Sequence, residues 1–163
     1  MLASDAASSC SVICGWISLV RDMSDDLRLD LYDLYIAFGK GRIDLVLNSF
    51  DDKAVFTSYA PIDVFPYLGR RAGKVSIAEM MKQVHAQFEH LTYQPIFVVA
   101  DKEEAAVIVM VKLRQRTTGR IIQLLNAHFI RFHNGLIIEL REFMDSFDAV
   151  QQVLGRQLNP MKL

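Results

Sequence analysis

The chain has 163 residues and a mass of 18.5 kDa, with 52% apolar residues, 23% charged residues and a formal net charge of −1. This length fits one domain with a sizeable core, and the composition excludes both a disordered chain and a nucleic-acid protein that relies on bulk positive charge. No apolar run approaches the roughly 20 residues that a membrane-spanning helix needs. We therefore expect a cytoplasmic globular domain that binds neither nucleic acid nor a membrane.

Residues 1–22 differ in composition from the rest, and we expect them to form a tail ahead of a single domain at 23–163. The tail is rich in Ser and Ala but lacks the basic start of a secretory signal, which disfavours secretion. Met23 could be the true first residue, and the alternative is a native tail that docks on the domain surface. The two cysteines of the tail, Cys10 and Cys14, make neither a disulfide framework nor a good zinc site.

The first half of the chain predicts mainly helices. Leucine and phenylalanine recur at helical spacing over 27–38, and the glycines that follow end that helix. A short helix over about 43–50 and an alternating strand over 53–59 come next. A serine–glutamate capping box then predicts a helix over 76–88 with one apolar stripe.

The second half of the chain predicts strands. Runs rich in Val, Ile and Phe lie at 93–99, 105–116, 120–132 and 136–144, and hairpin signals separate them. Helices followed by an antiparallel meander indicate an α+β domain whose helices pack on one face of the sheet.

The chain from about 27 to 157 also carries short motifs in a characteristic order. They are Gly41-Arg42-Ile43-Asp44, Phe50-Asp51-Asp52, Ala54-Val55-Phe56, Pro61, Gly69-Arg70, Phe132-His133-Asn134-Gly135, and Asp145 with Val153-Leu154-Gly155. Together they resemble the SnoaL-like group of the nuclear transport factor 2-like superfamily, which includes ketosteroid isomerase and limonene epoxide hydrolase. The resemblance implies a cone-shaped fold, in which a curved antiparallel sheet wraps around N-terminal helices and encloses a largely apolar pocket, often in a dimer.

The turn His133-Asn134-Gly135 decides which side chains of the last two strands share a face. A three-residue loop pairs Asn126 with Glu142 and places both, together with His128, among aliphatic residues on the inner face. A two-residue turn would instead set His128 beside Arg141 and bury charge, which makes that register less favourable. We therefore expect three polar groups in an otherwise aliphatic interior.

The resemblance gives two of these residues a role. Glu142 matches the position of the catalytic aspartate in the epoxide hydrolases, and His128 lies near the oxyanion-binding aspartate of ketosteroid isomerase, so both are catalytic candidates. The neighbours of Glu142 on its strand are aliphatic and predict a raised pKa for its carboxyl group, since desolvation disfavours the charged form. The ligand-binding candidates are Asn126, Tyr35, Ser58, Leu140, Met144 and Lys112. The alternative is a polar cluster that satisfies its own hydrogen bonds and does no chemistry.

The sequence departs from both families. Ser58 stands where the isomerase has its proton-shuttling base, and serine cannot do that work, so steroid isomerisation is disfavoured. The epoxide hydrolases carry Arg-x-Asp on the preceding strand, where this chain has basic residues from Lys112 to Arg116 and no aspartate. Lys112 or Arg114 could pair with Glu142 and keep it ionised, or these residues form an exposed basic edge.

Metal and nucleotide sites are not expected. His85 and His90 are five residues apart, which does not place them on one helical face, and we expect them to be packing residues. The glycines of 69–74 lack the spacing of a phosphate-binding loop. We therefore predict no cofactor.

Two functions remain open from the sequence. The first is a cofactor-independent lyase, isomerase or hydrolase that uses acid–base chemistry on a mostly apolar substrate. The alternative is a non-catalytic module that binds a small hydrophobic molecule or serves in dimerisation. A homodimer is expected in either case, because the outer face of the sheet would otherwise expose a large apolar patch. The residues expected on that patch are Val109, Val111, Leu125, Phe129 and Phe143.

Overall fold

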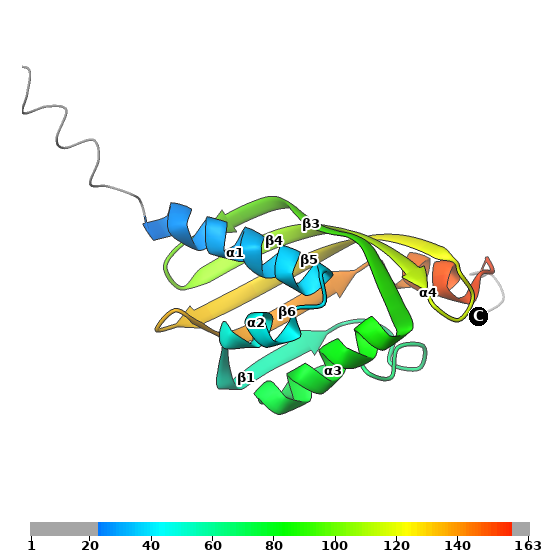
Figure 1. Cartoon of the computed structure of the whole chain (residues 1–163), viewed down its shortest axis with the longest axis horizontal. Coiled ribbons are helices and arrows are strands. Elements are labelled where there is room, and N and C mark those ends of the chain that lie inside the picture. The colour runs from blue at the N-terminus through cyan, green and yellow to red at the C-terminus, as the bar shows by residue number, and fades with distance from the viewer. Residues whose placement is uncertain (1–22, 158–163) are drawn as a thin grey trace, which may run out of the picture.

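The computed structural model describes residues 23–157, so the predictions for the tail with Cys10 and Cys14 lie outside the described residues. The elements, in chain order, are α1 (Met23–Gly39), α2 (Ile43–Asn48), β1 (Phe50–Ser58), β2 (Arg70–Ala72), α3 (Lys74–Gln87), β3 (Phe88–Ala100), β4 (Glu104–Gln115), β5 (Ile121–His133), β6 (Leu136–Met144) and α4 (Ser146–Leu154) (Figure 1). None of the helices within the described range is long and apolar enough to cross a membrane.

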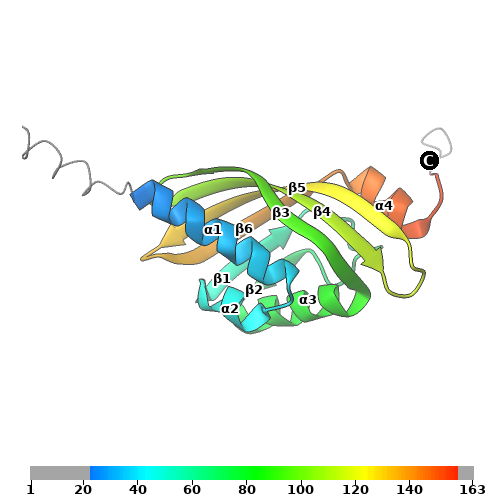
Figure 2. The ribbon, with the colours of Figure 1, turned by 45° about the horizontal axis from the view of Figure 1, so that its top comes forward.

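The strands form one sheet in the order β2-β1-β6-β5-β4-β3. Strands β3 to β6 make the predicted antiparallel meander, whereas β1 runs parallel to β6 and β2 runs antiparallel to β1. Figures 1 and 2 show a curved, unclosed sheet with α1, α2 and α3 gathered on one side of it. The predicted α+β class, with a curved sheet around N-terminal helices, is confirmed.

The alternation along β4 separates the two faces of the sheet. The odd-numbered residues from Ala105 to Leu113 are buried against the helices, as the period of two in a strand requires. The prediction that Val109 and Val111 lie on the outer face is therefore wrong, because they are 0% and 3% exposed. Ile108 and Met110 occupy the outer face of this strand instead.

The turn between β5 and β6 differs from the predicted three-residue loop. Asn134 and Gly135 have φ angles of 50° and 76°, as the tight two-residue hairpin turn requires, and His133 pairs with Leu136. One extra residue on β6, Ile138, then shifts the register in the manner of a β-bulge.

The bulge preserves the faces but changes the pairs. The predicted pairing of Asn126 with Glu142 is wrong, since His128 lies opposite Glu142 and Asn126 lies opposite Met144. This register differs from the predicted one by two residues, and an even shift leaves every side chain on its original face. Asn126, His128 and Glu142 accordingly share the buried face, at 5%, 3% and 7% exposure.

The start of α3 also differs from its prediction. The helix begins at Lys74, after Gly73 with a φ angle of 84°, and no side chain caps it, so the capping box of Ser76 and Glu79 is wrong. The Gly73 N–H donates to the Ala54 carbonyl at 2.8 Å, which ties the helix start to β1. This backbone contact sets the boundary that the local sequence pattern did not reveal.

Two short elements were not predicted. Strand β2 pairs with β1 inside the segment 69–74, which the sequence analysis considered only as a possible phosphate-binding loop. Helix α4 begins after Asp145, whose side chain accepts a hydrogen bond from the Asp148 N–H, and it ends at Gly155 in the left-handed conformation. Strand β2 forms one edge of the sheet beside β1, and α4 packs against β5 at one end of the sheet (Figure 1).

Candidate functional site

A cavity of about 120 Å³ lies on the helix-covered face of the sheet. Most of its lining is aromatic or aliphatic, with side chains from α1, α3 and the strands. The side chains with polar atoms that line it are Tyr35, Tyr67, His90, Tyr93, Asn126, His128 and Glu142. An apolar cavity with a few convergent polar groups is the usual form of a small-molecule site.

The carboxylate of Glu142 contacts three other polar side chains. Its Oε1 accepts a hydrogen bond from the Ser58 hydroxyl at 2.7 Å, and its Oε2 accepts one from the Asn126 amide at 3.0 Å. The Nε2 of His128 lies 3.1 Å from the same Oε2. Because an ionised carboxylate offers about four acceptor positions, these three contacts leave about one lone pair unused.

The environment lowers the pKa of Glu142, contrary to the sequence prediction. Burial by itself raises that pKa, but the hydrogen bond and charge of His128, with the hydrogen bonds of Ser58 and Asn126, together outweigh it. The predicted raised pKa is therefore wrong, because it considered the aliphatic neighbours on the strand and not the partners from adjacent strands. Glu142 is a carboxylate at neutral pH.

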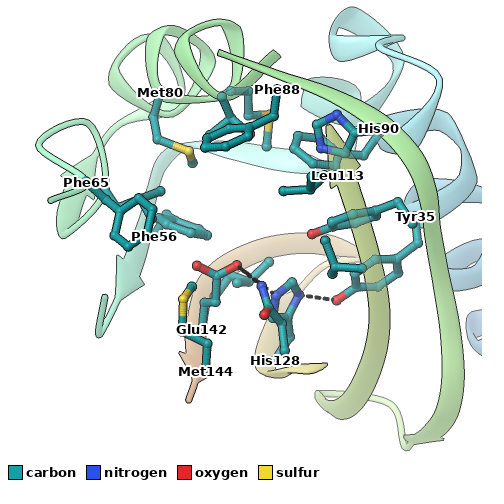
Figure 3. Close-up of a pocket in the computed structure, with 18 of the residues that line it drawn as sticks. Tyr35, Phe56, Phe65, Met80, Phe88, His90, Leu113, His128, Glu142 and Met144 are labelled. Carbon is teal, nitrogen blue, oxygen red and sulfur yellow. Dashed lines mark hydrogen bonds and ion pairs between the residues drawn. The ribbon is translucent and has the colours of Figure 1, made fainter. Parts of the chain in front are cut away.

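His128 connects Glu142 to the helix layer. Its Nδ1 lies 2.6 Å from the Tyr35 hydroxyl, and Figure 3 shows the two contacts of the ring as dashed lines. Since the Glu142 carboxylate can only accept, Nε2 of His128 carries a hydrogen, and in the tautomer with Nδ1 unprotonated that atom accepts from Tyr35. Burial, together with Tyr93 and the charge of Glu142, raises the pKa of Tyr35 well above its usual value, so its phenol stays protonated.

Asn126 offers an unused acceptor. Its Nδ2 donates to Glu142, and its Oδ1 is buried without a hydrogen-bond partner among the described residues. Leaving such a group unpaired costs about 1–3 kcal/mol, and the cavity wall is where a bound molecule can supply the missing donor.

The structure brings most of the predicted site residues together. Leu140 and Met144 line the cavity with Glu142, as Figure 3 shows for Met144. Ser58 does not line the cavity, but its hydroxyl donates a hydrogen bond to Glu142. The prediction for Lys112 is wrong, because this residue lies on the opposite face of β4 and does not line the cavity.

Arg114 does not pair with Glu142 either. Its Nη1 forms an ion pair with Glu89 at 2.8 Å on the outside of the domain. Neither basic side chain of β4 reaches the buried carboxylate, whose partner from the adjacent strand is His128.

His90 is a cavity residue that the sequence analysis took for packing. It lies on β3, whereas the sequence predicted a helix through Phe88 and a strand only from residue 93. Had the strand been started at Phe88, its alternation would have placed His90 on the inner face. Among the described residues, no three His, Cys, Asp or Glu side chains come together to hold a metal ion.

The family follows from comparison with known proteins. A family model described as SnoaL-like domain matches residues 31–140, and the chain belongs to this family of the nuclear transport factor 2-like superfamily. A comparison with curated proteins returns no match.

Solved structures agree with this assignment. A protein from Rhodopseudomonas palustris, provisionally assigned as an isomerase, is 32% identical over 76% of this chain and 91% of its own, with a TM-score of 0.69. An epoxide hydrolase from Mycobacterium tuberculosis is 14% identical over 82% of this chain and 92% of its own, with a TM-score of 0.66. A provisionally assigned polyketide cyclase from Xanthomonas campestris is 17% identical over 74% and 90%, with a TM-score of 0.61. The last two likenesses show the fold alone.

Proposed function

We propose that the protein is an enzyme that transfers protons to and from a mostly apolar small molecule, in a lyase, isomerase or hydrolase reaction that needs no cofactor. The observation that carries this proposal is the hydrogen-bonded chain from Tyr35 through His128 to Glu142 along the wall of an apolar cavity. A base whose second nitrogen is oriented by a buried carboxylate is a recurrent arrangement for acid–base catalysis.

The chain of hydrogen bonds gives the proton a defined route. A substrate hydroxyl or acidic C–H that reaches the Tyr35 oxygen gives up its proton as the tyrosine proton passes to Nδ1 of His128. The imidazolium that forms is stabilised by the Glu142 carboxylate at Nε2, and the reverse transfer returns the proton to the product. The remaining acceptor position of Glu142 offers a second, direct contact for a substrate hydroxyl or a water molecule.

Asn126 supplies the orientation. Its Oδ1 can accept a hydrogen bond from a hydroxyl of the bound molecule, next to the Glu142 carboxylate. The class of activity agrees with the R. palustris relative, which is provisionally assigned as an isomerase.

The first prediction tests Glu142. Glu142→Gln preserves the shape of the side chain but removes its charge, so the imidazolium of His128 loses its counter-ion. With a substrate found by screening small cyclic epoxides and ketones, we expect turnover to be abolished while affinity changes by less than about tenfold, or about 1.4 kcal/mol. Steady-state kinetics and calorimetric binding measure the two effects separately.

Glu139→Gln is the matched control. Glu139 is a carboxylate on the same strand, but it belongs to the outer face, where it pairs with Arg131 and Arg141. It should leave turnover unchanged. Unchanged turnover in Glu142→Gln would remove Glu142 from the mechanism.

A non-catalytic ligand-binding module is the second candidate. The observation that favours it is the saturation of the network, since three of the four acceptor positions of Glu142 are taken by the protein itself. Binding of cyclic epoxides and ketones by the wild-type protein without any turnover would establish this reading.

A further inference from the structure

The far end of the cavity holds a second polar group. His90 borders the cavity across from Glu142, as Figure 3 shows. His90 lies on the edge strand β3, whereas Glu142 lies on β6 in the interior of the sheet. The Nδ1 of His90 is buried and has no hydrogen-bond partner among the described residues. The proton route of the proposed function does not use this group.

The residues around His90 make ring contacts with it and leave its Nδ1 without a hydrogen bond. The ring packs against Phe38, His85 and Tyr93, with centroid distances of 5.3, 4.2 and 5.5 Å. Aromatic contacts of this kind are available to a phenylalanine as well, and they leave a buried imidazole nitrogen unpaired at a cost. His90 lines the cavity, and a buried polar atom without a partner on such a residue is a position at which a ligand can complete the hydrogen bond.

The ring of His90 is uncharged at neutral pH. Burial, followed by electrostatic interaction with His85 and Arg116, lowers its pKa to about 3. A neutral imidazole has one donor and one acceptor, so it suits a hydroxyl or a carbonyl and offers no attraction to a carboxylate or a phosphate.

We propose that His90 is the second anchor of the cavity, and that the ligand is a mostly apolar molecule about one ring in size with a hydroxyl group at one end and a hydroxyl or carbonyl group at the other. The hydroxyl end donates to Asn126 and Glu142, which offer only acceptors, and the other end meets His90. The size follows from the cavity volume of about 120 Å³, which is of the order of an apolar cavity that holds benzene. This inference deepens the proposed function and rests on its use of the same cavity.

Two compounds of nearly equal size test the second anchor. They are para-propylphenol and para-(hydroxyethyl)phenol, in which a terminal methyl group is replaced by a hydroxyl group. We expect the wild-type protein to bind the alcohol at least as tightly as the propyl compound, because His90 pairs with the added hydroxyl. In His90→Phe the hydroxyl is left unpaired, so the alcohol should bind at least about fivefold more weakly than in the wild type, while the propyl compound is unaffected.

His85→Phe is the matched control. This variant also replaces a histidine by phenylalanine, at the ring that packs against His90. His85 itself does not line the cavity. It should leave the affinities for both compounds unchanged. Dissociation constants from NMR titration provide the readout, and the fold of each variant is checked in the same spectra.

Three outcomes would overturn the proposal. They are equal weakening of both compounds in His90→Phe, the same loss of alcohol binding in His85→Phe, and failure of both compounds to bind the wild type. The measurement involves no turnover, so it is independent of the Glu142→Gln test of catalysis.

Discussion

The buried polar side chains of this domain form one connected group. In the described part of the chain, the buried polar or charged residues are Ser58, Asn126, His128 and Glu142, and each of the first three contacts the fourth. A buried charge is tolerated only when it is paired and hydrogen-bonded, and removal of one partner costs more than the bond itself contributes. The group therefore constrains both the stability and the chemistry of the cavity.

The second prediction concerns the pH dependence of stability. Because the folded state lowers the pKa of Glu142, its ionised form stabilises the fold above the ordinary value near 4.5, and this contribution is lost as the pH falls through the folded-state pKa. Denaturant unfolding of the wild type between about pH 7 and pH 3 should show this loss, and Glu142→Gln should show a flatter curve in the acidic part of that range. Equal slopes for the two proteins would mean that the pKa of Glu142 is not lowered by folding.

The residue types of the site were predictable, but their pairings were not. Asn126, His128 and Glu142 share a face whenever the true register differs from the predicted one by an even number of residues. The two-residue turn with its bulge gives a difference of two. The pairing depends on the bulge at Ile138, for which no local signal was recognised. The direction of the Glu142 pKa shift depends on His128, Ser58 and Asn126 together, and Ser58 lies 84 positions away in the chain.

At the scale of elements, the sequence analysis missed His90 as a cavity residue because it placed the boundary between α3 and β3 wrongly. Helix α3 ends at Gln87 and β3 begins at the next residue, so no turn signal separates them. The apolar stripe of the helix was extended into the strand, where the period changes from helical to alternating. His90 was therefore placed off the helix face instead of on the inner face of the sheet.

The side chain of Arg71 ties the loop between β1 and β2 to the sheet. The guanidinium of Arg71 donates to three backbone carbonyl groups, those of Tyr67 at 2.9 Å, Pro66 at 2.9 Å and Leu68 at 3.1 Å. Tyr67 and Leu68 line the cavity. The forked, planar group of arginine makes these bonds from two separate nitrogens, whereas the ammonium of lysine must donate from a single atom.

The third prediction is that Arg71→Lys loosens this loop. We expect faster amide hydrogen exchange over residues 61–68 and a loss of about 1 kcal/mol in the free energy of unfolding, because at least one carbonyl group loses its donor. Exchange measured by mass spectrometry reports the first effect and denaturant unfolding the second. Arg70→Lys, at the neighbouring exposed position on β2, is the control and should leave the loop protected. Equal protection in both variants would show that Arg71 does not hold the loop.

At the scale of the whole molecule, the two faces of the sheet have different environments. The helices cover the inner face and its cavity, while nothing within residues 23–157 covers the outer face of β4, β5 and β6 (Figure 2). There Leu125, Phe129 and Phe143 are 59%, 52% and 40% exposed, and Tyr59 stacks on Phe143 with a centroid distance of 4.4 Å. We call this surface, completed by Ile108 and Met110, the outer apolar patch.

The last prediction is that the outer apolar patch joins two copies of the chain into a homodimer. Contiguous apolar surfaces of this kind are rarely left exposed by monomers, and a two-fold axis lets the same patch serve both copies. The ion pairs of Arg131 and Arg141 with Glu139 lie beside the patch, as expected for a polar rim around an apolar centre. Sedimentation equilibrium at micromolar concentration should give the mass of a dimer for the wild type and of a monomer for Phe129→Glu, because a charge in the patch would be buried without a partner. Val75→Glu places the same charge on an exposed apolar position of α3 and should leave the dimer intact, whereas a monomeric wild type would refute the prediction.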